Sequence, residues 1–118
     1  MVLSNKLKGN KMKKILTSVM AMGIMVVSAQ ATCASYGCNG KITTLRALTD
    51  GSILIGTDGD ESNMNCTAVS GQFALLRLSD AGGNAAYSAL LTAKTTNTPI
   101  LVRIVEGTAN CQVGYIGL

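Results

Sequence analysis

Three carboxylates crowd into the short stretch TDGDESNMNC, residues 57–66, which ends in a cysteine. From Asp58 the pattern D-x-D-x-S begins like a calcium-binding loop, in which side-chain oxygens at alternate positions surround the ion. Such a loop needs glycine at its sixth position and glutamate at its twelfth, where this chain has Asn63 and Val69. Calcium is therefore the weaker interpretation. Asp, Gly, Ser and Asn also bond their own backbone in turns, so we predict a polar turn and no metal site.

The same carboxylates are poor candidates for catalysis. A glycosidase needs two carboxyl groups that face each other across about 5 to 10 Å, and Asp58, Asp60 and Glu61 are neighbours on one turn. The chain has no histidine, so it cannot form a Ser-His-Asp or Cys-His arrangement. It also has no phosphate-binding glycine loop of the GxxxxGK[ST] type. We therefore predict no catalytic residue, no cofactor and no enzyme activity.

Arginines and one tyrosine are the candidate ligand-binding residues. Arg46, Arg77 and Arg103 lie in runs that read as strands, and on one common face they would bind an anion such as a sugar carboxylate. The alternative is that each points to solvent or protects a sheet edge. Tyr36 lies in a short Cys-x4-Cys loop, and we expect it to be the best exposed aromatic side chain for stacking against a sugar.

Residues 1–31 have the pattern of a secretory signal peptide. Five lysines precede an apolar run, and small residues lead to a cleavage point after Ala31. The run is shorter than the ~20 residues of a membrane-spanning helix, so we expect no transmembrane segment after cleavage. Met12 is an alternative start, and a lipoprotein signal is disfavoured because Thr32 precedes Cys33. We predict a secreted or periplasmic protein.

Residues 32–118 form the expected mature domain, and its charge differs from that of the whole chain. The full sequence has a net charge of +4, but five of its ten basic residues lie in the leader. The remaining five basic and six acidic residues give a net charge of −1. A nucleic-acid-binding domain carries a basic surface, so we predict no nucleic-acid partner.

All four cysteines, Cys33, Cys38, Cys66 and Cys111, lie in the exported part. In an oxidising compartment an even count predicts two disulfides, and without histidine a zinc site would need all four thiolates. Three pairings are possible, and the sequence does not choose between them. We favour Cys33 with Cys38 and Cys66 with Cys111. These bridges would close loops of 6 and 46 residues, worth about 2 and about 4 kcal/mol in the loop-entropy account.

The expected domain alternates β-rich runs with one helical segment. An Asp-Gly pair between the first two runs predicts a hairpin. Asn84 can cap a helix in which apolar residues, Leu90 and Leu91 among them, recur at helical spacing through about Thr95. Asn97 and Pro99 end this helix. The expected strands are residues 41–48, 52–57, 70–78, 100–107 and 111–118. Five strands with a helix between the third and fourth is the order of the OB-fold, so we predict a mainly β, five-stranded, OB-like Greek-key barrel. An open α+β sandwich is the alternative.

The run NAAYSALLTAKTTNTPILVRIVEGTANC, together with GKITTL, GSILIGTDG and Cys66, resembles the binding subunits of subtilase cytotoxins over nearly all of residues 37–118. This resemblance implies an OB-fold, a bridge between Cys66 and Cys111, a homopentameric ring and a glycan or glycoprotein ligand at the cell surface. The family's contact residues do not carry over to residues 36–39. The resulting expectation is a glycan-binding protein, and the alternative is a periplasmic or surface module that binds another protein or has a structural role.

Overall fold

A computed structural model describes residues 31–118, and the predicted leader lies outside the described residues except for Ala31. This part of the chain forms seven short strands, one α-helix and one 3-10 helix. In chain order the elements are β1 (Thr32–Ala34), β2 (Gly37–Gly40), β3 (Ile42–Ala47), β4 (Ser52–Thr57), η1 (Glu61–Asn63), β5 (Ala74–Arg77), α2 (Gly83–Thr96), β6 (Ile100–Ile104) and β7 (Val113–Gly117).

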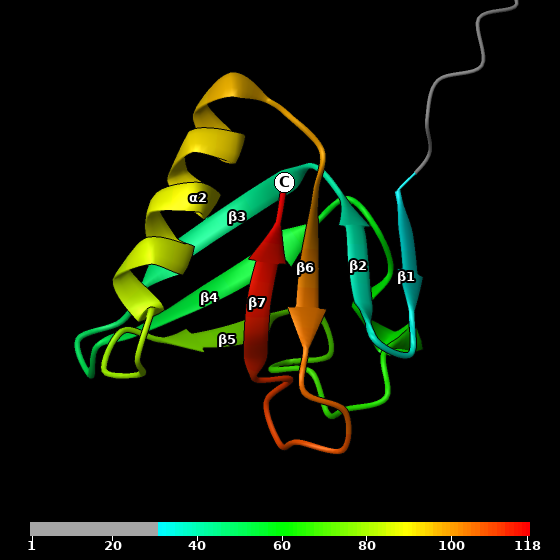
Figure 1. Cartoon of the computed structure of the whole chain (residues 1–118). Coiled ribbons are helices and arrows are strands. Elements are labelled where there is room, and N and C mark those ends of the chain that lie inside the picture. Colours follow the sequence, from blue (N-terminus) through cyan, green and yellow to red (C-terminus); the bar gives the residue numbers. More distant parts are fainter. Residues whose placement is uncertain (1–30) are drawn as a thin grey trace, which may run out of the picture.

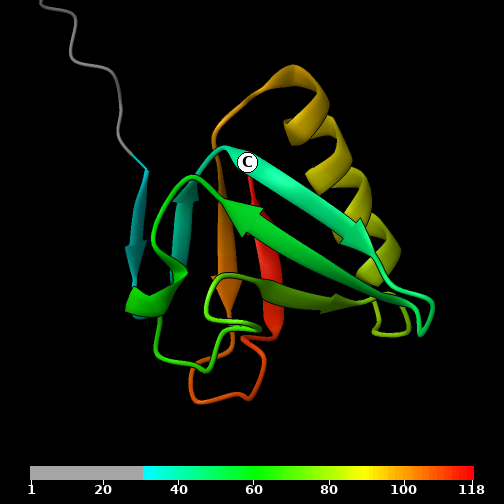
Figure 2. The same cartoon turned by 180° about the vertical axis from the view of Figure 1, so that it is seen from behind.

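The strands form two antiparallel sheets that pack against each other as two layers (Figures 1 and 2). One sheet has the order β1-β2-β6-β7 and the other the order β3-β4-β5. Only Lys41 separates β2 from β3, so the chain passes from one sheet to the other through a sharp bend. The helix α2 contacts β3, β5 and β7, and it thereby covers one side of the space between the layers (Figure 1).

The prediction of a five-stranded barrel is wrong in two respects, although a mainly β fold with one helix is confirmed. Residues 31–118 form seven strands, because β1 and β2 make a hairpin that the sequence pattern does not predict. These strands have only three and four residues, which is too short for a readable alternation. The sheets also do not close into a barrel: β5 meets the segment before β7 only at an isolated parallel bridge between Leu75 and Gln112.

The predicted hairpin, β3 with β4, and the helix lie close to their predicted positions. β3 and β4 pair in antiparallel register, and Gly51 in their turn has φ +87°, a conformation that suits glycine. Helix α2 ends at Asn97, which adopts the left-handed conformation of a C-cap. The predicted N-cap is wrong by two residues. Gly82 precedes the helix with no side-chain cap, and Asn84 lies within the first turn.

The core lies between the two sheets and the helix and is built from aliphatic side chains. In β5, Ala74 and Leu76 are buried and the following Leu78 is partly buried, as alternation along residues 70–78 predicts, but Leu75 on the opposite face is buried as well. On α2 the buried residue Leu90 faces this core, whereas Leu91, which we also expected there, is 42% exposed. The largest fully buried side chains are those of Ile53, Ile55, Leu90, Val102, Cys38 and Cys111.

Both disulfides have the favoured pairing, Cys33 with Cys38 and Cys66 with Cys111. The first joins directly opposed residues of β1 and β2, and the second spans 45 positions of sequence. Two native disulfides are typical of proteins that fold in an oxidising compartment. Within residues 31–118, no helix is long and apolar enough to cross a membrane.

We expect the long disulfide to contribute more stability than the short one. Replacing Cys66 and Cys111 together by alanine should lower the free energy of unfolding by about 4 kcal/mol, against about 2 kcal/mol for the Cys33 and Cys38 pair, because the longer loop loses more entropy on closure. Guanidinium denaturation of the two double variants and the wild type measures both values. Equal losses would contradict the loop-entropy account of this fold.

Candidate functional site

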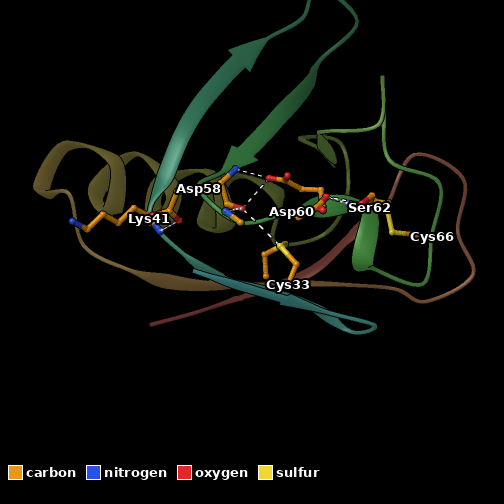
Figure 3. The surroundings of a disulfide bond; sticks show 11 residues. Cys33, Lys41, Asp58, Asp60, Ser62 and Cys66 are labelled. Atoms are coloured by element: carbon orange, nitrogen blue, oxygen red, sulfur yellow. Dashed lines mark hydrogen bonds between the residues drawn. A yellow bond between two sulfur atoms is a disulfide. The ribbon is translucent and has the colours of Figure 1, made fainter. Parts of the chain in front are cut away.

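The stretch TDGDESNMNC forms a turn in which the carboxylates accept hydrogen bonds from nearby backbone N–H and hydroxyl groups (Figure 3). Asp58 accepts a hydrogen bond from the backbone N–H of Lys41 at 2.9 Å, and this holds the bend between β2 and β3. Glu61 accepts from the N–H and the hydroxyl of Thr57 at 2.7 and 2.8 Å, both through Oε1. Asp60 caps η1. These contacts support the interpretation as a polar turn.

The Asp60 carboxylate shows how local this bonding is. Its Oδ1 accepts the hydroxyl of Ser62 at 2.6 Å and the backbone N–H of the same residue at 3.1 Å. The Ser62 hydroxyl, followed by its N–H, lowers the pKa of Asp60 because both bonds favour the ionised form. Within residues 31–118, no group of three or more carboxylates and cysteines is placed to hold a metal ion.

An arginine between two tyrosines is the most distinctive cluster on the outer face of the four-stranded sheet. Val102 and Ile104 on β6 are buried, so the alternation of the strand turns Arg103 outward. Its guanidinium carbon lies 5.1 Å from the centre of the Tyr36 ring and 6.0 Å from that of Tyr115. Both distances are within the range of cation–π attraction.

The register of the sheet explains why these side chains meet. Arg103 is paired with Tyr115 on β7 and with Gly37 on β2, and Tyr36 directly precedes that glycine. Gly37 has φ +155°, and a Cβ atom at this position would overlap the carbonyl oxygen of Val102. Only glycine therefore allows β2 to approach β6 this closely. The Tyr36 ring is held beside Arg103 as a result.

Tyr115 is the site residue that sequence reasoning missed. Simple alternation places it on the same face as Val113, but the pairing of β6 and β7 shifts between Arg103 and Ile104. This irregularity leaves Val113 packed against the core and turns Tyr115 outward, where it is 52% exposed. Tyr36 is half-buried, so the expectation that it is the best exposed aromatic is wrong.

The other two candidate arginines lie on the three-stranded sheet, so the three do not gather on one face. Arg46 is paired with Leu54, and its guanidinium carbon lies 5.4 Å from the centre of the Phe73 ring. It lines a groove of about 590 Å³. Arg77 is paired with Ser52 and lines a separate groove of about 470 Å³.

The Arg103 cluster combines a cation with two aromatic rings on one face of the sheet. Its guanidinium has aromatic neighbours and forms no ion pair with a carboxylate of the described residues. An arginine without a carboxylate partner keeps its N–H groups available for an anion, and tyrosine rings present flat faces and hydroxyl groups. Such a surface suits an acidic sugar.

Comparison of the chain with family models, curated proteins and solved structures finds no match.

Replacing Ser62 by alanine should raise the pKa of Asp60 toward its ordinary value, because the hydroxyl that favours the carboxylate is lost. In the wild type, the lowered pKa gives a stabilising contribution that is present above the unfolded pKa and is lost as pH falls through the folded pKa. Carbon-13 NMR titration of the aspartate carboxyl groups measures the change. Ser79→Ala is the control, and an unchanged Asp60 midpoint in Ser62→Ala would contradict the assignment.

Replacing Gly37 by alanine should destabilise the protein by about 1 to 3 kcal/mol, because the new methyl group forces β2 away from β6. The matched control is Gly114→Ala, whose Cβ would meet its nearest neighbour, a Val105 methyl carbon, at an ordinary 3.4 Å. Denaturant unfolding compares the two variants. A Gly37→Ala protein as stable as the control would show that the close approach is not required.

Proposed function

We propose that this protein is an exported, non-catalytic binding protein that recognises glycans or glycoconjugates. The observation that carries the proposal is the outward-facing Arg103 guanidinium held between the rings of Tyr36 and Tyr115. We propose further that the glycan carries a carboxylate, because an arginine fork binds a carboxylate through two parallel hydrogen bonds. The aromatic rings would stack against the apolar faces of the sugar.

The structure of the cluster favours a preorganised site. Arginine loses side-chain freedom when it binds a ligand, and this lowers affinity. Here two rings already lie within cation–π distance of the guanidinium. The antiparallel register fixes Arg103 and Tyr115 on adjacent strands, and Tyr36 in the turn directly before β2. A site built on paired strands also holds its geometry better than one built on a free loop.

The resemblance to subtilase cytotoxin binding subunits supports the same class of function. An OB-like topology agrees with the near-continuous β2 and β3 and with the parallel bridge between Leu75 and Gln112. A homopentameric ring and secretion or periplasmic export belong to the same proposal. Light scattering of the purified protein tests the ring, and a monomer would remove this part of the proposal.

A glycan array probed with the oxidised protein tests the function. Acidic glycans should bind. Arg103→Ala should lower affinity by about 10- to 150-fold, because a hydrogen bond to a charged group contributes about 1.5 to 3 kcal/mol. Tyr36→Ala and Tyr115→Ala should lower it by about 2- to 10-fold each, in line with aromatic contacts of about 0.5 to 1.5 kcal/mol.

The matched control is Lys94→Ala, which removes an exposed cation on α2 and should leave binding unchanged. Binding that survives Arg103→Ala would place the ligand elsewhere. If no glycan binds, a module that contacts another protein becomes the better interpretation of the exposed Tyr115.

A further inference from the structure

We propose a second binding site, for neutral sugars, on the outer face of the three-stranded sheet. The site is the groove of about 590 Å³ between β3, β4, the loop before η1 and the turn before β5. The three-stranded sheet faces the viewer in Figure 2. The groove is on the other sheet from Arg103, and it does not depend on the function proposed above. The residues that carry the argument are Thr44, Arg46, Thr57, Glu61, Gln72 and Phe73.

Phe73 supplies the stacking surface. Its ring lies over Gly56, where a Cβ atom would come within 3.3 Å of the ring edge, so the absence of a side chain lets the ring rest on the sheet. Arg46 stacks on this ring at 5.4 Å and is held in place by the contact. The Phe73 side chain lines the groove and is only half-buried, so the part of the ring that neither Gly56 nor Arg46 covers can pack against the C–H face of a sugar.

Glu61 supplies a buried acceptor with one unused oxygen. The residue is only 5% exposed, and both of its hydrogen bonds, from Thr57, go to Oε1. These bonds leave Oε2 without a donor in residues 31–118, and no fully buried side-chain oxygen in that range lacks a partner, so Oε2 is not fully buried. Because Glu61 lines the groove, a ligand hydroxyl there would donate to this oxygen.

The charge of the groove selects the class of ligand. Asp60 and Glu61 outnumber the single cation Arg46, so the lining has a net charge of −1 and disfavours phosphates and acidic sugars. The hydroxyl group of Thr44 and the side-chain amide of Gln72 add both hydrogen-bond donors and acceptors to the groove. A ligand with one apolar face and several hydroxyl groups, and no charge, matches this set. A neutral pyranose has these properties.

Nitrogen-15 NMR titration of the oxidised protein tests the site directly. The probes are the methyl glycosides of glucose, galactose, mannose and N-acetylglucosamine, each raised to about 50 mM because single-sugar sites have millimolar Kd values. At least one probe should shift the amide signals of Gly56, Thr57, Glu61 and Gln72 and saturate. No saturating shift with any of the four probes, or shifts confined to the Arg103 face, would overturn the proposal.

Side-chain variants show which groups make the contact. Phe73→Ala should weaken the best probe at least threefold and Glu61→Gln about tenfold, while their matched controls Leu91→Ala and Glu106→Gln leave the Kd unchanged. Gln72→Ala changes only an exposed turn side chain, so it should fold normally and should also weaken binding. Unchanged affinity in folded Phe73→Ala and Gln72→Ala would overturn the proposal even if Glu61→Gln fails to fold.

Discussion

The bridge between Cys66 and Cys111 is the constraint on which the two-layer arrangement depends. It ties the loop after η1 to the segment that leads into β7, 45 positions further along the chain. Cys111 is completely buried, and its carbonyl accepts the N–H of Leu75 at 3.0 Å, beside the parallel bridge where the two sheets meet. A domain of this size buries little apolar surface, so a covalent link at this junction replaces packing that aromatic side chains would otherwise supply.

The two sheets pack as layers that do not close into a barrel, and this gives the molecule two separate outer faces. The four-stranded sheet presents Arg103 between two tyrosines, without a carboxylate partner among the described residues. The three-stranded sheet presents Arg46 against Phe73, in a groove that also holds Asp60 and Glu61. A closed barrel with all three arginines on one face would give a single anion site. Within residues 31–118, two layers instead place an arginine without a carboxylate partner on one sheet and a weakly acidic groove on the other.

The sequence predicts the parts of the fold that depend on local chemistry. The Asp-Gly turn, the left-handed Asn97 and the alternation of Ala74 and Leu76 all follow from residues that lie next to each other. The β1–β2 hairpin does not follow, because its strands are too short for a pattern. The outward position of Tyr115 does not follow either, since it depends on a shift in pairing with a strand nine residues earlier in the chain. Two of the three residues of the candidate site, Tyr36 and Arg103, are therefore accessible from the sequence, and its most exposed member, Tyr115, is not.

Glycine has a similar role at both candidate sites, because at each one the lack of a side chain leaves room that positions an aromatic ring. Gly37 lets β2 approach the carbonyl of Val102 and sets Tyr36 beside Arg103. Gly56 leaves the space on which the Phe73 ring lies. In each case the missing side chain brings a ring into contact with an arginine, and the arginine then loses freedom before any ligand arrives. These glycines weaken their strands, because glycine has the highest conformational entropy in the unfolded chain. The disulfides offset that loss by restricting the same unfolded chain, and they thereby permit the two glycines on which both candidate sites depend.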